Sequence, residues 1–157
     1  MYIHIKEGGK QPMPPKASRN RDCLEANTRK MSRVLSTIYT NALKESKLKP
    51  TQLSLLSVIN AYGKISIGKL SKVMLMDQTT VTRNIKLLKK SGYVKINSGD
   101  DRRVKEISLT PKGQEVRDNA LPAWQEIQSK VWDKLGEEKV RHLFDLVDEI
   151  IELSNEA

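Results

Sequence analysis

Residues 77–109 constrain the fold of this chain more than any other stretch of it. Residues 77–91 carry apolar side chains at helical spacing, and Gly92 follows as a stop signal. Residues 93–97 alternate between apolar and polar side chains and predict a strand. Residues 98–102 are typical of a turn, and residues 104–109 predict a second strand. This order predicts a helix, a tight stop and a β-hairpin with a basic tip.

Three further helices are expected before this stretch. Apolar residues at spacings of three, four and seven predict a first helix over residues 22–46. Pro50 fits the first turn of a second helix over residues 50–62. Ser66 can cap a third helix over 67–74, in which Ile67, Leu70 and Val73 are expected to face inward. Only a few residues separate the third helix from the helix at 77–91, which is typical of a helix-turn-helix. Residues 64–66 are expected to form a short strand beside the hairpin.

Two long helices are expected after the hairpin. Thr110 and Pro111 are a cap and a first-turn proline, and they predict a helix over residues 111–135 that Pro122 bends. A last helix over residues 137–153 has an apolar stripe that is expected to be buried. The expected fold is therefore mainly α with a small β-hairpin wing, a winged helix-turn-helix flanked by N- and C-terminal dimerisation helices.

The expected domain organisation follows from these elements. A flexible basic arm at residues 1–20 precedes a single domain at 21–157. Within that domain, the winged helix-turn-helix takes up about 50–110, and helices at about 22–47 and 111–155 carry more apolar surface than a small winged domain needs. That excess favours a homodimer, whose two recognition helices, about 34 Å apart, would match half-sites one DNA turn apart.

Charge favours a polyanionic partner. The net charge is +9; basic residues outnumber acidic ones up to residue 113, and the reverse holds from 114 onward. The alternative is a solvated, lysine-rich surface. The single cysteine excludes an intrachain disulfide, and no apolar run approaches the roughly 18–20 residues of a membrane span. We therefore expect a cytoplasmic protein with no membrane association.

Enzyme chemistry has little support in the sequence. His4 and His142 are isolated, and Cys23 has no histidine near it in sequence. The sequence shows neither a phosphate-binding loop nor the spacing of metal ligands. We therefore expect no catalytic residue, no metal and no cofactor. The acidic run in the last helix is interpreted as its solvent face.

The helix at 77–91 carries residues suited to reading DNA. Base edges in the major groove are met by short donors and by arginine, and a recognition helix presents them on its exposed face. The candidates here are Gln78, Thr79, Thr82, Arg83 and Lys86. The alternative is a polar face that only meets solvent.

The hairpin tip is a second candidate contact. An arginine on a narrow tip can enter an electronegative minor groove, and Arg102 and Arg103 lie at this tip. Asp101 could orient the Arg103 guanidinium by a charge-assisted hydrogen bond. The alternative is a charged turn that prevents pairing between sheet edges.

Three segments together resemble the MarR family (multiple antibiotic resistance regulators): LKPTQLSLLSVI, IGKLSKVMLMDQTTVTRNIKLLKKSGYV and DDRRVKEISLTPKG. The resemblance covers roughly residues 24–153. It implies a homodimeric transcription factor, usually a repressor, on a pseudo-palindromic operator of double-stranded DNA. The recognition positions of the family fall on Gln78, Thr79, Thr80, Thr82 and Arg83, and its wing arginine falls on Arg103, oriented by Asp101.

The resemblance also implies a means of regulation. Family members commonly bind small aromatic ligands in a cleft, for which Tyr39, Tyr62 and Trp124 are candidates, although such aromatics are often core residues. Some members sense oxidants through a cysteine near the start of the first helix, where Cys23 lies; the alternative is an incidental thiol. We expect a sequence-specific repressor released by a ligand. The alternatives are a thiol-based oxidant sensor of the same fold and a non-specific architectural DNA-binding protein.

Overall fold

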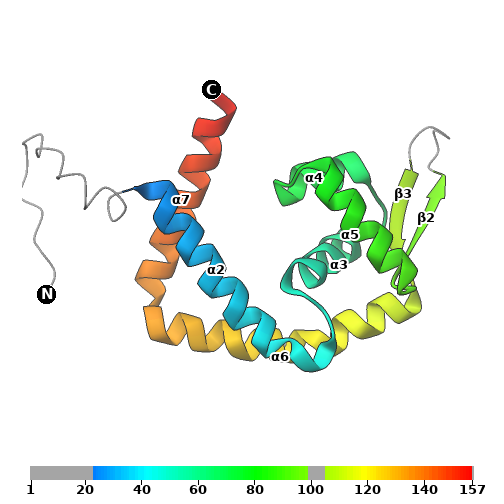
Figure 1. The fold of residues 1–157 in the computed structure, drawn as a ribbon, viewed down its shortest axis with the longest axis horizontal. Coiled ribbons are helices and arrows are strands. Elements are labelled where there is room, and N and C mark those ends of the chain that lie inside the picture. The colour runs from blue at the N-terminus through cyan, green and yellow to red at the C-terminus, as the bar shows by residue number, and fades with distance from the viewer. Residues whose placement is uncertain (1–22, 99–104, 157) are drawn as a thin grey trace, which may run out of the picture. The chain divides into compact units, whose positions relative to one another are not determined.

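The computed structural model describes residues 23–98 and 105–156. The chain divides into two compact units, one ending at Ser36 and one starting at Thr37, and each is described by itself. The elements in chain order (Figure 1) are α2 (Leu24–Ala42), the 3-10 helix η1 (Lys44–Ser46), α3 (Pro50–Tyr62), β1 (Ile65–Ser66), α4 (Ile67–Met74), α5 (Gln78–Lys90), β2 (Val94–Ser98), β3 (Lys105–Leu109), α6 (Pro111–Leu135) and α7 (Glu137–Glu156). No helix in the described part of the chain has the length and apolar character needed to span a bilayer.

Most predicted helices occur where the sequence placed them. The bounds of α3, α4 and α6 agree with the prediction, and Asp77 and Ser91 are the caps of α5. The first helix ends earlier than expected, at Ala42, because the chain tightens into η1 before Lys47 adopts a left-handed conformation with φ of 58°. The last helix instead continues to Glu156.

Side-chain caps fix the starts of α4 and α6. The Ser66 hydroxyl accepts a hydrogen bond from the Lys69 N–H at 3.2 Å at the start of α4. The Thr110 hydroxyl accepts one from the Gly113 N–H at 3.0 Å at the start of α6. Each cap satisfies a backbone donor that the first helical turn leaves without a partner. The prediction of these caps from sequence is confirmed.

The strands form one small antiparallel sheet in the order β1-β3-β2. Ile107 on the central strand β3 pairs with Ile65 of β1 on one side and with Ile96 of β2 on the other. The expected short strand therefore exists and pairs with the hairpin. This pairing attaches the hairpin to the segment between α3 and α4 by main-chain hydrogen bonds.

One face of α5 is buried in the core of the second unit. Val81, Ile85 and Leu88 are 0–1% exposed. They pack in a cluster that also includes buried residues of α3, α4 and the sheet, among them Leu55, Leu56, Ile59, Leu70 and Ile107. The spacing i, i+4, i+7 places these three side chains on one side of the helix, so the other side must face outward.

The inner face of α4 differs from the prediction in one position. Val73 was expected to face inward with Ile67 and Leu70, but it is 42% exposed. Leu70 is fully buried, and Ile67 and Met74 pack against the core. The inner stripe therefore follows the spacing 67, 70 and 74, and Val73 lies beside it.

The apolar stripe of α7 is mostly exposed in the single chain, which corrects the prediction that it is buried. Val140 is 3% exposed, but Phe144, Val147 and Ile150 are 44–49% exposed. The reason is that α6 packs on the start of α7, where the rings of Trp132 and Phe144 meet edge to face with centroids 6.0 Å apart. The later turns of α7 extend past this contact.

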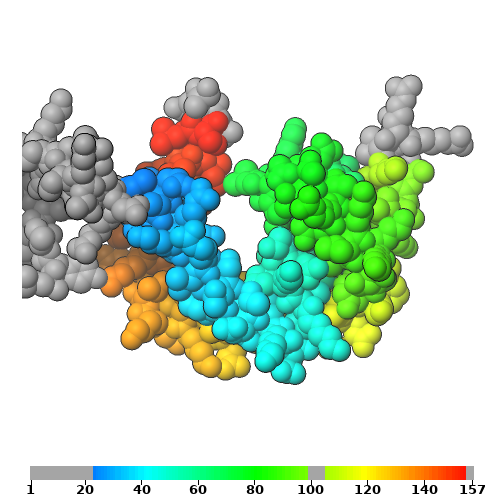
Figure 2. All heavy atoms as spheres, viewed as in Figure 1, coloured from blue at the N-terminus to red at the C-terminus, as the bar shows by residue number. Residues whose placement is uncertain are grey.

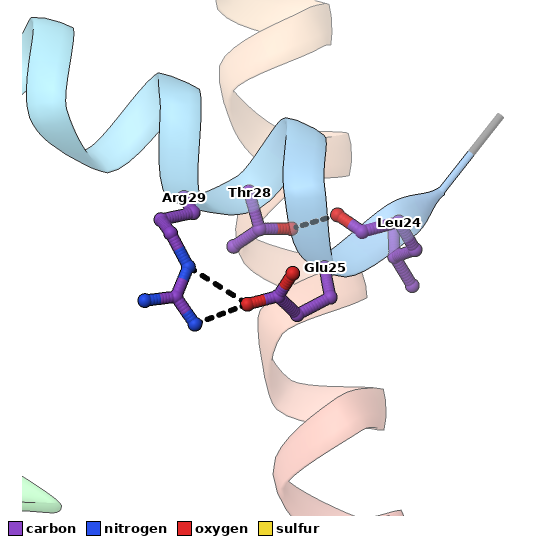
Figure 3. Close-up of polar contacts among 4 residues, drawn as sticks. All are labelled: Leu24, Glu25, Thr28 and Arg29. Atoms are coloured by element: carbon purple, nitrogen blue, oxygen red, sulfur yellow. Dashed lines mark hydrogen bonds and ion pairs between the residues drawn. The ribbon is translucent and has the colours of Figure 1, made fainter. Parts of the chain in front are cut away.

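Several large apolar residues of α2 in the first unit are also exposed. Leu24 and Val34 are 68% and 59% exposed, and α2 as a whole has no buried residue. Its first turns are held by contacts within the helix (Figure 3): the Thr28 hydroxyl donates to the Leu24 carbonyl at 2.9 Å, and Arg29 Nε donates to Glu25 Oε1 at 2.8 Å. Exposed ion pairs of this kind add little stability.

The core role of α5 gives a first testable prediction. Replacing Ile85, which is 1% exposed, by Ala should lower the free energy of unfolding by about 2–5 kcal/mol, because the side chain leaves a cavity. Replacing Leu87, which lies on the same helix and is 51% exposed, should cost less than about 1 kcal/mol. Urea unfolding at one fixed protein concentration measures both. Equal losses would contradict the assigned burial of α5.

Candidate nucleic-acid interface

The outward face of α5 forms a shallow polar recess. The side chains that line it are those of Gln78, Thr79, Thr82, Arg83 and Lys86, and the recess has a volume of about 520 Å³. Four of these residues are exposed and Thr82 is half-buried. Figure 2 shows the atoms of α4 and α5 in green next to the yellow-green atoms of the hairpin strands. The structure therefore brings together five of the six residues predicted on this helix.

Burial of the opposite face positions these side chains. Because Val81 and Ile85 point into the core, residues 78, 79, 82, 83 and 86 turn to the outside of the same helix. The first turn contains no acidic residue, and basic residues lie along the rest of α5. The recess therefore combines a cationic fork at Arg83, an amide at Gln78 and hydroxyls at two threonines.

Thr80 is the sixth predicted residue, and it has a different setting. Its N–H donates to Asp77 Oδ1 at 2.7 Å, and it does not line the recess. The hydrogen bond from the Thr80 side chain, together with backbone N–H donors, lowers the pKa of the Asp77 carboxyl. The Asp77 carboxylate therefore stays ionised at pH values somewhat below the ordinary pKa of an aspartate. The stability that this cap contributes is present above that ordinary pKa and is lost as the pH falls through the lowered pKa.

The recess has the chemistry of a nucleic-acid reader. A guanidinium can fork onto guanine, an amide can pair with adenine, and threonine can meet a phosphate or a thymine methyl group. Among the described residues, no group of His, Cys, Asp and Glu side chains is arranged to hold a metal ion.

The predicted wing contacts cannot be placed in the same way. Asp101, Arg102 and Arg103 lie outside the described residues. The strands that lead to them are described, and Lys95 and Lys105 are exposed on β2 and β3. The base of the wing is therefore basic. The arm at residues 1–20 also lies outside the described part.

Two of the three aromatic residues predicted to line one cleft, Tyr39 and Trp124, lie together, and Tyr62 has a different setting. The rings of Tyr39 and Trp124 lie with centroids 6.4 Å apart, and the Tyr39 hydroxyl donates to Gln128 Oε1. Partial burial raises the pKa of Tyr39. Tyr62 has another setting, because Lys69 Nζ lies 4.5 Å from the centroid of its ring.

Sequence reasoning missed most of the residues that form the apolar cavity near Trp124. This cavity, of about 280 Å³, lies between α3 and α6 and is lined by Leu53, Ser54, Ser57, Val58, Leu121 and Trp124. A usable signal was present, because Ser54 and Ser57 are small residues that interrupt the apolar run from Leu53 to Val58. Small side chains on one helix leave space beside a large ring on its neighbour.

Cys23 is exposed immediately before α2. Its carbonyl accepts hydrogen bonds from the backbone and side-chain nitrogens of Asn27, at 3.1 and 2.9 Å. Cys23 therefore lies at the start of the first helix, as expected from sequence. Its use as an oxidant sensor stays a prediction.

Comparison with known proteins gives consistent results. The model of the MarR family matches residues 46–104. An uncharacterised HTH-type transcriptional regulator of Bacillus cereus is 30% identical over 109 residues, which cover 69% of this chain and 73% of that protein. The HTH-type transcriptional regulator SarZ of Staphylococcus saprophyticus is 36% identical over 81 residues, or 51% of this chain and just over half, 56%, of SarZ.

A solved structure extends the similarity over most of the chain. The transcriptional regulator MosR of Mycobacterium tuberculosis, in complex with DNA, superposes with a TM-score of 0.75 at 32% identity. The match covers 84% of this chain and 98% of that one. The predicted fold class is confirmed by this likeness, and the predicted absence of enzyme activity agrees with relatives that are transcriptional regulators. The chain belongs to the MarR family of winged helix-turn-helix transcriptional regulators.

Proposed function

We propose that this protein is a sequence-specific DNA-binding regulator that inserts α5 into the major groove of its operator. The observation that carries the proposal is the recess on α5, where a guanidinium, an amide and two hydroxyls are presented together on a helix held rigidly from behind. MosR, a relative of similar fold, is bound to DNA in its solved structure, which supports the same partner here.

The residues of α5 have different roles in this proposal. Arg83 and Gln78 reach base edges, because their planar ends can make paired hydrogen bonds. Thr79, Thr82 and Lys86 contact phosphates or a thymine methyl group. Thr80 supports the start of the helix through Asp77. In the wing, Arg103 enters the minor groove with Asp101 beside it, and Arg102 contacts phosphate; these assignments rest on the sequence.

We propose further that the functional unit is a homodimer. The later turns of α7 and the N-terminal part of α2 each expose apolar side chains that a single chain does not cover. Such exposure is unfavourable in water and typical of an interface. In this proposal residues 21–157 act as one regulator, and the two copies of α5 read half-sites of a pseudo-palindrome one helical turn apart.

The proposed regulation is repression relieved by a small apolar or aromatic ligand. The cavity between α3 and α6 supports it, since it is mainly apolar and close to the smallest size usual for ligand sites, roughly 300 Å³. Filling it would press on α6 at Leu121 and Trp124. A coupling of about 1–3 kcal/mol would change operator affinity some 5–150-fold.

The role of Arg83 is tested by substitution. Arg83→Ala should weaken binding to an operator duplex that the wild type has selected from a random pool, by about 1–3 kcal/mol. It should also relax base preference at one position, because the paired hydrogen bonds of the guanidinium are lost. Arg83→Lys is the matched variant, since it keeps the charge and loses the fork. Binding to a library of single-base operator variants measures both. An unchanged base preference in both variants would remove Arg83 from base reading.

The same assay separates this proposal from a non-specific architectural role. A protein that relies on phosphates alone would bind operator and random duplex equally at moderate salt.

A thiol-based sensor is distinguished by Cys23→Ser, which would abolish the release of DNA by peroxide if that thiol were the sensor. In vitro transcription from a promoter that carries the operator gives the sign of regulation.

The dimer is tested on α7. The double variant Val147→Asp and Ile150→Asp should convert the protein to a monomer and lower operator affinity at least about 10-fold, because it places charge on the exposed apolar stripe. The double variant Asp148→Ser and Glu149→Ser changes two exposed residues of the same helix and should stay dimeric. Analytical ultracentrifugation measures the mass. A dimer that survives the aspartate variant would locate the interface elsewhere.

The ligand site is tested with phenol and benzoate as probes. Either probe should release operator DNA from the wild type. Ser57→Phe fills the cavity, so the operator affinity of this variant should be the same with and without the probe. Ser54→Ala should still release operator DNA when the probe is added. Fluorescence anisotropy of labelled operator measures release. An unchanged response in Ser57→Phe would exclude this cavity as the site of release.

A further inference from the structure

The C-terminal end of α5 is closed by its own backbone. The N–H of Gly92 donates to the Lys89 carbonyl at 2.9 Å, and the N–H of Tyr93 donates to the Leu88 carbonyl at 2.9 Å. Gly92 has φ of 76°, so this is a Schellman ending in which glycine adopts the left-handed conformation. The ending leaves the carbonyls of Ser91, Gly92 and Tyr93 directed away from the helix ladder.

The start of α6 supplies donors to all three of these carbonyls. Lys112 Nζ donates to the Ser91 carbonyl at 3.1 Å, and the Thr110 hydroxyl donates to the Gly92 carbonyl at 2.6 Å. The Thr110 N–H donates to the Tyr93 carbonyl at 3.0 Å. The end of α5 is thus hydrogen-bonded to the start of α6 by residues that lie 17 to 21 positions apart in the sequence.

Gly113 lets the two backbones approach this closely. A Cβ atom at this position would lie 1.9 Å from the Tyr93 carbonyl oxygen and 2.7 Å from its carbonyl carbon. Both are backbone atoms, so no side-chain rotation could relieve the overlap. Glycine is a poor residue for a helix, and its place in the first turn of α6 is explained by this contact.

Lys112 adds charge to the same contact. Its ammonium lies 5.4 Å from the centroid of the Tyr93 ring and beside the negative dipole end of α5. Both interactions favour a cation. The segment Thr110–Gly113 therefore binds α5 through side chain, backbone and charge together.

We propose that Thr110, Lys112 and Gly113 are positioning residues for DNA reading. They form a rigid joint that fixes the angle between α5 and α6, so that α6 carries the recognition helix with it when α6 moves. This inference rests on the proposed function of α5. If the joint is lost, α5 can tilt. A tilted α5 still meets phosphates, but its base contacts are misaligned. Base reading therefore depends partly on residues that do not line the recess.

Two matched pairs of variants test the joint. Thr110→Val keeps the shape of the side chain and loses the hydroxyl, whereas Thr110→Ser keeps the hydroxyl. Gly113→Ala introduces the overlap, whereas Gly68→Ala makes the same change in α4 where nothing lies within 4 Å of the new Cβ. Each full-length variant is assayed on a duplex that the wild type has selected from a random pool, and on random duplex, after the folded fraction is measured by circular dichroism.

The decisive readout is the ratio of the two affinities. Thr110→Val and Gly113→Ala should lower the preference for the selected duplex by roughly 10-fold or more, while affinity for random DNA and its salt dependence change by less than about twofold. Thr110→Ser and Gly68→Ala should retain the wild-type preference. A purely structural role would lower the folded fraction and leave the ratio unchanged.

The failures of the two proposals can be told apart. If folded Thr110→Val prefers the selected duplex as strongly as the wild type does, the proposed role of the joint is wrong. The proposal is also wrong if this variant loses affinity for both duplexes in parallel. If Gly113→Ala does not fold, the Thr110 pair decides alone. If the wild type itself shows no preference for the duplex it has selected, the proposed sequence-specific function fails, whatever the variants do.

Discussion

Burial of one side of α5 is the interaction on which the rest of the structure depends. Val81, Ile85 and Leu88 fix the helix against α3, α4 and the sheet, and their spacing forces Gln78 and Arg83 outward. Each buried aliphatic side chain contributes about 1.5–3 kcal/mol, so the helix has little freedom to rotate about its axis. The rigidity of the reading face is therefore a consequence of core packing.

The joint between α5 and α6 extends that rigidity along the chain. Thr110 satisfies the Gly92 carbonyl, and Gly113 permits contact with the backbone of Tyr93. At its far end α6 packs against α7, whose Phe144 and Ile150 are exposed. A single chain thus holds α5 firmly and leaves apolar surface uncovered, and this uncovered surface supports the proposed homodimer.

Local signals explain which features could be predicted from the sequence. Caps, prolines and glycines act within a few residues, so Ser66 and Thr110 marked helix starts correctly. Features that depend on distant neighbours were not predictable. The helical spacing of apolar residues in α7 identified its apolar stripe, but it did not show whether another part of the chain covers that stripe. The sequence also did not show that Lys69 lies over the Tyr62 ring. Gly113 was visible as a glycine in a helix, but only the fold shows the carbonyl it approaches.

In the proposed dimer, two copies of α5 read two half-sites in successive major grooves. Hydroxyl-radical footprinting of the wild type on its selected duplex tests it most directly. Such a dimer should give two protected regions related by a two-fold axis, with the half-site centres about 10–10.5 base pairs, or about 34 Å, apart. A single protected patch, or uniform protection that random duplex reproduces, would contradict it.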